Sequence, residues 1–275
     1  MGALLDEHAG VLLDAYGVLI DASGVLPGAA ALIAELDRRG LPWMVVTNDA
    51  SRSATTYAAR FAGLGLPVPA ARVLTSGSLL PGHFRAHGLA GARTCVLGTA
   101  DSIAYVAEGG GVPVALEAGM ELDALAVCDD AGFPFLTGME LSVSAIVRAI
   151  AAGRTPALIL PNPDLVYPKG GGELGITAGA MALVIEAVVA RRFPSLGLRF
   201  VHLGKPEPLV FLEAARRLGV AAPRLVMIGD QLETDIAGAR AAGLSAALLT
   251  GISRWTDAQH ATTVAPTHLL ATIEP

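Results

Sequence analysis

Four hydrophobic runs in this chain each end in a polar turn, and these four ends constrain its fold more than any other feature. The runs end at Asp14, at Thr47-Asn48, at Lys205 and at Asp230. In open α/β folds, ligands bind at the carboxyl ends of the strands. An acid at the end of a buried strand is costly unless it is used or paired. We therefore predict that these residues form one ligand-binding edge of a parallel sheet.

Each polar end also has a structural explanation when it is taken alone. Asp14 could be a turn or cap carboxylate, and Thr47-Asn48 could cap the helix that follows. Lys205 could be a solvated loop lysine, and Asp230 could belong to a turn before a helix, where the dipole favours carboxylates. Four such segments in one order are difficult to obtain by accident. Their combination favours the functional interpretation.

The combination suits phosphoryl transfer through a covalent carboxyl phosphate. Asp14 would be the nucleophile, a role that carboxylates play in aspartyl-phosphate enzymes. A phosphate dianion beside carboxylates needs positive charge, which Lys205 and a divalent metal would supply. The Thr47 hydroxyl and the Asn48 amide can donate hydrogen bonds to phosphate oxygens without adding charge. Asp14 and Asp230 offer the hard oxygen ligands that Mg²⁺ prefers.

With these motifs the chain resembles the haloacid dehalogenase (HAD) superfamily, specifically its NagD-like and 4-nitrophenyl-phosphatase-like subgroup with a large α/β cap. The strongest match is residues 229–239, followed by residues 242–243 and 249–251. These residues are similar to the subgroup pattern GDxxxTDIxGAxxAG…TG. The resemblance covers essentially the whole chain and implies a Rossmann-like core with an inserted α/β cap domain.

Two further motifs carry the same resemblance. Residues 204–208 read Gly-Lys-Pro-Glu-Pro and resemble the third motif of the subgroup. Residues 47–52 resemble the second motif, in which Asp49 replaces a usual asparagine. The resemblance implies phosphate binding by Thr47, Asn48 and Lys205.

The first motif implies the metal site and also departs from the family pattern. The resemblance assigns Mg²⁺ to Asp14, the backbone carbonyl of Tyr16, Asp230 and Asp235. Most phosphatases of the superfamily carry a second aspartate, the general acid/base, where this chain has Tyr16. A tyrosine with a pKa near 10 is a poor base at neutral pH. Loss of a positioned acid/base costs ~10²–10⁴ in rate, or roughly 3–5.5 kcal/mol of barrier.

The tyrosine leaves other functions open. One is a slow phosphatase or phosphotransferase, and another is a non-catalytic protein that binds a phosphorylated metabolite. A third is a metal-free 2-haloacid dehalogenase, because in those enzymes this motif has the sequence Asp-Ala-Tyr-Gly. They carry a helical cap between the first two motifs, whereas only 33 positions separate Asp14 from Thr47 here. A metal-free dehalogenase also need not keep both Asp230 and Asp235, so we rank this function last.

Strand and helix signals alternate along the chain and predict a doubly wound parallel core. Core strands are expected at residues 10–14, 43–46, 225–228 and 245–249, with another beginning at residue 201. The interval between Asn48 and Lys205 is far longer than one crossover needs and repeats the same signals. We therefore expect core residues 1–81, an α/β cap at residues 82–196, and core residues 197–275.

The cap should determine substrate identity, because the core handles only the phosphoryl group. Residues 161–164 read Pro-Asn-Pro-Asp and resemble a loop of the subgroup that faces the active site. Asn162 and Asp164 are therefore candidate substrate-loop residues. The alternative is a proline-stiffened turn in which both side chains bond their own backbone. Dimers through the cap are common in the subgroup, so a homodimer is one expected assembly.

Composition excludes several other classes of protein. The chain has 275 residues, a net charge of −6 and a pI near 5.5, which argues against a nucleic-acid surface. It contains no uncharged run of 18 residues, so no membrane span is expected. The N-terminus is acidic where a signal peptide is basic. The two cysteines, Cys95 and Cys128, suggest buried thiols in a reducing cytosol, so we expect a cytoplasmic protein.

These observations lead to one principal hypothesis. The chain should be a Mg²⁺-dependent phosphatase that hydrolyses a small phosphorylated metabolite through an aspartyl phosphate at Asp14. Sugar phosphates are one candidate class of substrate.

Overall fold

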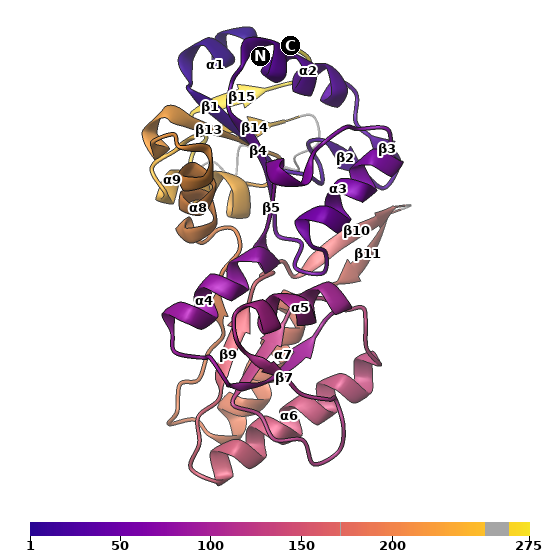
Figure 1. The fold of residues 1–275 in the computed structure, drawn as a ribbon, viewed down its shortest axis with the longest axis vertical. Coiled ribbons are helices and arrows are strands. Elements are labelled where there is room, and N and C mark those ends of the chain that lie inside the picture. The colour runs from indigo at the N-terminus through magenta and orange to yellow at the C-terminus, as the bar shows by residue number, and fades with distance from the viewer. Residues whose placement is uncertain (171, 251–263) are drawn as a thin grey trace. The chain divides into compact units, whose positions relative to one another are not determined.

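The computed structural model describes residues 1–170, 172–250 and 264–275, and the chain divides into two compact units. The core unit comprises Met1–Thr47, Ala54–Leu74 and Lys205–Pro275. The cap unit comprises Asn48–Ser53 and Thr75–Gly204. Figure 1 shows both units as ribbons.

The core unit is built on a parallel sheet. Within the described residues, its strands run in the spatial order β15 (His268–Leu270), β14 (Ser245–Leu249), β13 (Leu225–Gly229), β1 (Gly10–Leu13), β4 (Trp43–Thr47) and β5 (Val73–Thr75). The pairings of β1 with β13 and β4, and of β14 with β13 and β15, are all parallel. Parallel neighbours need crossover connections, which helices supply. The predicted doubly wound α/β fold class is confirmed.

Helices cover both faces of the core sheet (Figure 1). One face carries α1 (Gly2–Glu7), α2 (Ala29–Arg39) and α3 (Ala54–Gly63), and the other carries α8 (Pro208–Leu218) and α9 (Ala237–Ala241). Val11 and Leu13 of β1 pack with α1–α3, while Leu12 between them is equally buried and points to the opposite face. A strand covered on both sides reads as one hydrophobic run, which explains the sequence of β1.

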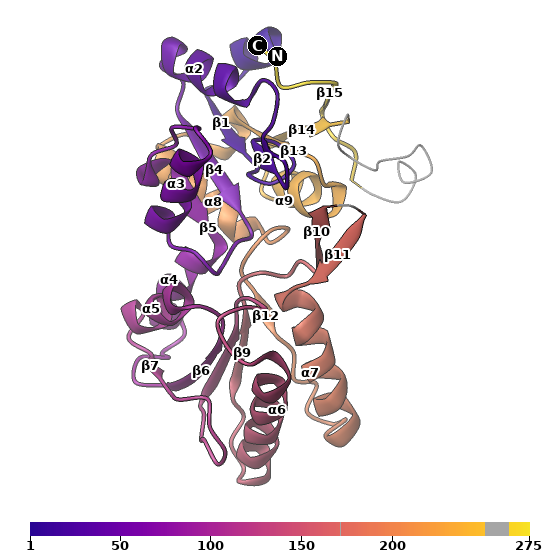
Figure 2. The ribbon, with the colours of Figure 1, turned by 90° about the vertical axis from the view of Figure 1, so that its right-hand side faces the viewer.

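The cap unit has a parallel sheet of its own. Its strands run in the order β12 (Val201–His202), β9 (Ala157–Leu160), β8 (Ala124–Val127), β6 (Arg93–Leu97) and β7 (Val112–Pro113). Helices α4 (Leu80–Ala86) and α5 (Ala100–Glu108) lie on one side of this sheet, and α6 (Phe135–Ala151) and α7 (Ala178–Arg192) lie on the other (Figure 2). Buried side chains of α6 and α7, such as Ile146 and Ile185, form the core with Leu125 and its strand neighbours.

Two antiparallel hairpins complete the fold. In the core unit, β2 (Ile20–Asp21) and β3 (Gly24–Val25) form a short hairpin soon after β1. In the cap unit, β10 (Val166–Gly170) pairs with β11 (Glu173–Ile176). The second hairpin begins soon after the loop at residues 161–164 and leads into α7.

One predicted element was assigned to the wrong sheet. The strand expected in the core from residue 201 is β12, which pairs with β9 of the cap sheet. Both of its residues, Val201 and His202, are exposed, so they do not form a buried core strand. The units accordingly divide at residues 74/75 and 204/205, outside the cap limits of 82–196 that the sequence suggested.

Two smaller expectations concern the chain as a whole. Within the described ranges, every helix is too short or too polar to span a bilayer. Gly251, the last residue of the sequence pattern at residues 249–251, lies outside the described residues.

The division into units predicts that a substitution in the hydrophobic core of one unit destabilises mainly that unit. Ile146→Ala in α6 removes a fully buried side chain from the hydrophobic core of the cap unit. It should lower the free energy of unfolding of this unit by about 2–5 kcal/mol. Hydrogen exchange should then accelerate in residues 75–204 and stay unchanged in β1 and β13. Leu36→Ala, a matched variant in α2 of the core unit, should give the opposite distribution. Equal acceleration of hydrogen exchange in both units of either variant would contradict the division into two units.

Candidate active site

Asp14 lies directly beyond β1 and is buried, with 4% of its surface exposed. Its backbone N–H donates to the carbonyl of Ile228 at 2.9 Å, so the ladder between β1 and β13 continues to this residue. On the other side β1 pairs with β4, which ends at Thr47. The parallel register therefore brings three of the predicted polar ends to one edge of the sheet.

Lys205 is shared between two carboxylates. Its Nζ donates to Oδ1 of Asp14 and to Oδ1 of Asp235, each at 2.6 Å. All three residues are buried. Burial opposes the charged ammonium, but the two carboxylates outweigh it and hold the pKa of Lys205 above its usual range. Lys205 is therefore a permanently charged cation rather than the solvated loop lysine of the alternative interpretation.

A close backbone approach places Asp235 beside this lysine. Asp235 belongs to a π-helical turn, Leu232–Ile236, and its Oδ2 accepts the N–H of Gln231 at 3.2 Å. A Cβ atom on Gly229 would lie 2.3 Å from the Cβ of Asp235. Only glycine at position 229 leaves room for Asp235 to fold back against the end of β13.

Asp230 has a buried oxygen that lacks a partner. Its Oδ1 is inaccessible to solvent and has no hydrogen bond among the described residues. On its other side, a Cβ on Gly17 would lie 2.4 Å from Asp230 Oδ2, and the φ of Gly17 is +100°. A side chain at position 17 would be both strained and in collision with the carboxylate. The first motif thus packs closely around Asp230, whose buried Oδ1 has no hydrogen-bond partner among the described residues.

The three acids form a cluster suited to a divalent cation. Oxygen atoms of Asp14, Asp230 and Asp235 all lie within 4.8 Å of one another. Burial and the neighbouring carboxylates raise the pKa of Asp14, which Lys205 opposes, and burial and the same neighbours raise the pKa of Asp230. The positive charge of Lys205 does not balance three carboxylates. Hard oxygen donors, excess negative charge and the orphaned Asp230 Oδ1 together fit Mg²⁺.

The second motif spans both units. Thr47 ends β4 in the core unit, whereas Asn48 belongs to the cap unit. Both side chains are buried, with 6% and 5% exposed. Asn48 Nδ2 donates to Oδ1 of Asp164 at 2.9 Å, so one donor of the amide predicted to bind phosphate is engaged by a cap carboxylate.

Cap side chains hold the backbone of residues 48–53. Four carbonyls of this segment accept hydrogen bonds from hydroxyl groups of the cap, in the donor–acceptor pairs Ser76–Asn48, Ser102–Ala50, Thr99–Ser51 and Tyr105–Arg52. The N–H of Ser53 donates to Asp101 Oδ2 at 2.7 Å. These bonds hold the backbone of residues 48–53, and α3 begins after them at Ala54.

Tyr16 is partly exposed and follows β1 in a turn closed by the N–H of Gly17, which donates to the Ile20 carbonyl at 2.8 Å. Burial and the carboxylate of Asp21 raise the pKa of Tyr16. The phenol is therefore neutral at physiological pH and cannot act as the base that an aspartate would supply. The metal ligand that the resemblance implies is the backbone carbonyl of Tyr16, which does not depend on the side chain.

The loop at residues 161–164 forms the self-bonded turn of the alternative interpretation. Asn162 Oδ1 accepts the N–H of Asp164 at 3.1 Å, which is the self-bonded turn. Asn162 Nδ2 donates to Oγ1 of Thr177 at 3.2 Å. Asp164 in addition contacts Asn48, a residue of the second motif. The two side chains are therefore structural within the cap unit, and their role as substrate-loop residues remains a prediction.

Sequence reasoning missed the cap residues that hold the second motif. Ser76, Thr99, Ser102 and Tyr105 are ordinary residues of the cap in sequence, and their partners are backbone carbonyls. The one local signal is the capping box that Thr99 and Ser102 form at the start of α5. This signal identifies a helix start and gives no indication of residues 48–53.

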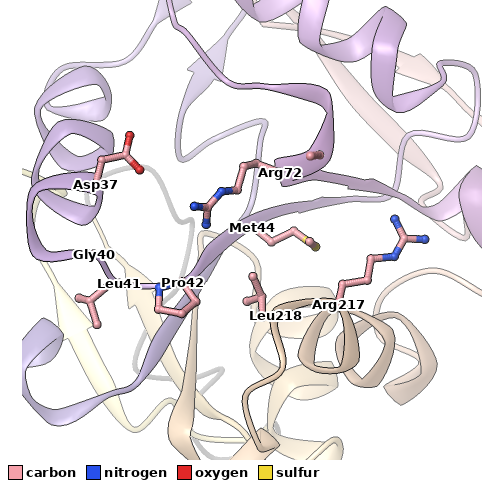
Figure 3. Close-up of a pocket in the computed structure, with 9 residues that line it drawn as sticks. Asp37, Gly40, Leu41, Pro42, Met44, Arg72, Arg217 and Leu218 are labelled. Carbon is pink, nitrogen blue, oxygen red and sulfur yellow. The ribbon is translucent and has the colours of Figure 1, made fainter.

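A separate pocket lies on the core unit, away from these acids. Its volume is about 560 Å³, and its lining includes Pro42 just before β4, Met44 of β4, Arg72 and Arg217 (Figure 3). Arg72 lies over the ring of Trp43 at 5.0 Å and donates to its carbonyl. These residues stand at the amino end of β4, opposite Thr47. The pocket therefore plays no part in the chemistry of the acidic cluster.

Comparison with protein families gives two matches. Residues 11–112 match the model described as haloacid dehalogenase-like hydrolase. Residues 202–274 match the model described as HAD-hydrolase-like. The matched segments contain Asp14, Thr47, Lys205, Asp230 and Asp235.

Individual proteins show the same relationship. The chain is 31% identical to D-glycerol 3-phosphate phosphatase of Mycobacterium tuberculosis, over 98% of this chain and 71% of that protein. A possible sugar phosphatase of Cytophaga hutchinsonii superposes with a TM-score of 0.85 at 30% identity, covering 100% of this chain and 97% of the other. NagD from E. coli K-12 superposes with a TM-score of 0.77 at 23% identity, covering 97% of each chain, which indicates a shared fold.

The acidic cluster predicts that Asp230 destabilises the metal-free protein. Asp230→Asn removes one of three repelling carboxylates and should raise the melting temperature without Mg²⁺ by a few degrees, since 1 kcal/mol corresponds to roughly 2–4 °C at this size. Added Mg²⁺ should stabilise the wild type and leave the variant unchanged in a thermal-shift assay. Asp129→Asn, at a partly buried cap acid, is the control and should keep the Mg²⁺ response. A metal-free variant less stable than the wild type would contradict this account.

Proposed function

We propose, because this chain belongs to the haloacid dehalogenase-like hydrolases, that it is a Mg²⁺-dependent phosphatase acting through an aspartyl phosphate at Asp14. One observation carries the proposal: Lys205 joins the buried Asp14 and Asp235 beside the orphaned oxygen of Asp230. Such a set has an anionic nucleophile, a fixed cation and a place for a metal. The related D-glycerol 3-phosphate phosphatase and possible sugar phosphatase favour a phosphorylated polyol or sugar as substrate.

In the first step, a carboxylate oxygen of Asp14 attacks the phosphorus atom. The new bond joins Asp14 to phosphorus, and the bond from phosphorus to the ester oxygen breaks, so the alcohol leaves as an alkoxide that takes a proton. Asp14 Oδ1 is held by Lys205 at 2.6 Å, which fixes the carboxylate plane for attack by the other oxygen. Orientation of this kind supplies much of the rate of intramolecular reactions.

Charge and hydrogen bonds then stabilise the transferring group. Lys205 and the Thr47 hydroxyl would contact phosphoryl oxygens, the first as a cation and the second as a neutral donor. Asp14, Asp230, Asp235 and the Tyr16 carbonyl would hold Mg²⁺, which would supply further charge neutralisation.

The second step returns Asp14 to its starting state. A water molecule attacks phosphorus, the bond between phosphorus and the Asp14 oxygen breaks, and inorganic phosphate leaves. Tyr16 affects both steps, because a neutral phenol with a raised pKa cannot remove a proton from that water. The alkoxide of the first step must then take its proton from solvent, and the attacking water of the second step must give its proton to solvent. We therefore expect slow turnover, and good leaving groups should be hydrolysed much faster than poor ones.

Tyr16 also supports a second candidate function. A protein with the complete phosphate site and no acid/base would bind a phosphorylated metabolite and scarcely hydrolyse it. Assaying a panel of phosphorylated metabolites with and without Mg²⁺ separates the two functions. Tight binding without release of phosphate would favour the binding protein. Chloride release from a 2-haloacid without metal would instead favour the dehalogenase that we rank last. A homodimer through the cap and a cytoplasmic location remain predictions from the sequence.

Asp14→Asn should abolish hydrolysis and leave the fold intact. The substitution keeps the shape of the side chain and removes the nucleophile. Release of inorganic phosphate should fall by at least about 10³-fold, measured alongside circular dichroism. Asp37→Asn, an exposed acid of α2, is the control and should retain wild-type rates. Near-wild-type hydrolysis by Asp14→Asn would disprove the covalent mechanism.

Tyr16→Asp should raise hydrolysis by about 10-fold or more, because a positioned acid/base contributes ~10²–10⁴ in rate. The gain should be larger for an alkyl phosphate than for 4-nitrophenyl phosphate, since protonation matters most for a basic leaving group. Tyr16→Asn provides a control of similar size without an ionisable group and should bring no such gain. A folded Tyr16→Asp variant that is no faster on either substrate would assign Tyr16 to ligand binding.

A further inference from the structure

The pocket at the amino end of β4 lies wholly within the core unit, at the opposite end of this strand from Thr47 (Figure 3). Its volume of about 560 Å³ falls within the roughly 300–1,000 Å³ that small-molecule sites have. The lining includes three charged residues, Asp37, Arg72 and Arg217, and three apolar ones, Pro42, Met44 and Leu218. A ligand of this pocket must therefore suit two cations, one acid and an apolar surface.

A buried tryptophan holds two of these charged groups. Trp43 is 1% exposed, and its Nε1 donates to Asp37 Oδ1 at 2.8 Å. The guanidinium of Arg72 lies over the same ring, 5.0 Å from its centroid, and donates through Nη1 to the Trp43 carbonyl at 2.9 Å. These contacts restrict two otherwise flexible side chains before any ligand binds. Such preorganisation lowers the entropic cost of binding.

Both arginines have donors to offer a ligand. Nε and Nη2 of Arg72 have no hydrogen-bond partner among the described residues. Arg217 donates from Nε to Glu213 Oε1 at 2.8 Å, and its two terminal nitrogens have no partner in the described part of the chain. A guanidinium can bind a carboxylate through two parallel N–H groups. The arginine side of the pocket therefore suits a carboxylate.

The side of the pocket formed by α2 has the opposite preference. Asp37 lies in the last turn of α2, and the C-cap residue Gly40 also lines the pocket. The carboxyl end of a helix carries partial negative charge and favours cations. Asp37 and Arg72 form no ion pair with each other in the described structure, so their charged atoms lie more than about 4 Å apart. A cationic group of a ligand is favoured beside Asp37.

We propose that this pocket binds a zwitterionic α-amino acid with an aliphatic side chain. Arg72 and Arg217 hold the carboxylate, and Asp37 holds the ammonium group. The aliphatic side chain packs on Met44 and Leu218. An α-amino acid carries both charges on one carbon atom, which matches an acid and a guanidinium held against one indole ring. A purely anionic ligand would instead be repelled by Asp37 and by the end of α2.

Fluorescence of Trp43 measures this binding directly, because Arg72 lies over its ring. The chain has two tryptophans, Trp43 and Trp255, so Trp255→Phe leaves Trp43 as the only one. The probe is L-leucine, and calorimetry on the wild-type protein gives an independent dissociation constant. We expect saturable binding in both assays. Neither assay contains a phosphate ester, so the result does not depend on the proposed phosphatase activity.

Analogues of leucine separate the three parts of the proposed ligand. Isocaproate lacks the ammonium group, leucinol lacks the carboxylate, and glycine lacks the aliphatic side chain. Isocaproate and leucinol should each bind at least about 10-fold more weakly than leucine, because each loses a hydrogen bond between charged groups. Glycine should also bind more weakly, because it buries no apolar surface on the floor of the pocket.

Substitutions in the pocket separate the same contributions. Arg72→Gln should weaken leucine binding by about 10-fold or more, and Arg217→Gln, at an exposed position, should also weaken it. Asp37→Asn keeps an oxygen that accepts from Trp43 and removes the negative charge. It should weaken the binding of leucine and leave that of isocaproate undiminished. Circular dichroism checks that each variant is folded.

Arg148→Gln is the matched control. Arg148 belongs to the cap unit and, like Arg72, donates to a backbone carbonyl, that of Met120 at 2.8 Å. This variant should bind leucine as the wild type does.

Three results would overturn the proposal. The first is the absence of saturation up to about 10 mM leucine, which corresponds to a free energy of binding too small for a specific site. The second is isocaproate binding as tight as that of leucine, because the ammonium group would then contribute nothing. The third is undiminished leucine binding by folded Arg217→Gln and Asp37→Asn variants, which would place the ligand elsewhere.

Discussion

The double ion pair of Lys205 is the interaction on which the rest of the site depends. A buried ammonium is costly unless it is paired, and loss of Lys205 would leave the buried carboxylates of Asp14 and Asp235 without their cation. The two acids come from opposite ends of the sequence, Asp14 after β1 and Asp235 after β13. The parallel pairing of β1 with β13 therefore brings both carboxylates to Lys205, in addition to forming the hydrophobic core.

The same charge balance explains the shape of the nearby backbone. Three carboxylates crowd around one lysine, and glycines at positions 17 and 229 provide the space that their side chains need. The remaining negative charge raises the pKa of Asp14 and Asp230. A site of this kind is unfavourable until a cation and a phosphate bind. Stability is thus reduced at the position where the proposed chemistry needs a strong electrostatic field.

The sequence predicted the elements whose signals are local or whose motifs are specific. Membership of the HAD family, the NagD-like fold and the parallel core are confirmed, because the hydrophobic runs and their polar ends are continuous in sequence. The strand at Val201–His202 was assigned to the wrong sheet, since Val201 pairs with Ile159 of β9, 201 − 159 = 42 positions earlier, and such a distant partner leaves no local signal in the sequence. The hydroxyls that hold residues 48–53 bond backbone carbonyls, which have no sequence signature. The roles of the site residues, including the effect of Tyr16 on the rate of turnover, remain predictions.

Chemical trapping of the intermediate tests the central claim most directly. The wild-type protein is mixed with Mg²⁺ and 4-nitrophenyl phosphate, reduced with borohydride during turnover, digested and examined by mass spectrometry. An aspartyl phosphate is reduced to homoserine, so the account predicts homoserine in place of Asp14, only when substrate is present. Hydrolysis that proceeds with Asp14 unmodified, or a phosphoryl group found on another side chain, would contradict it.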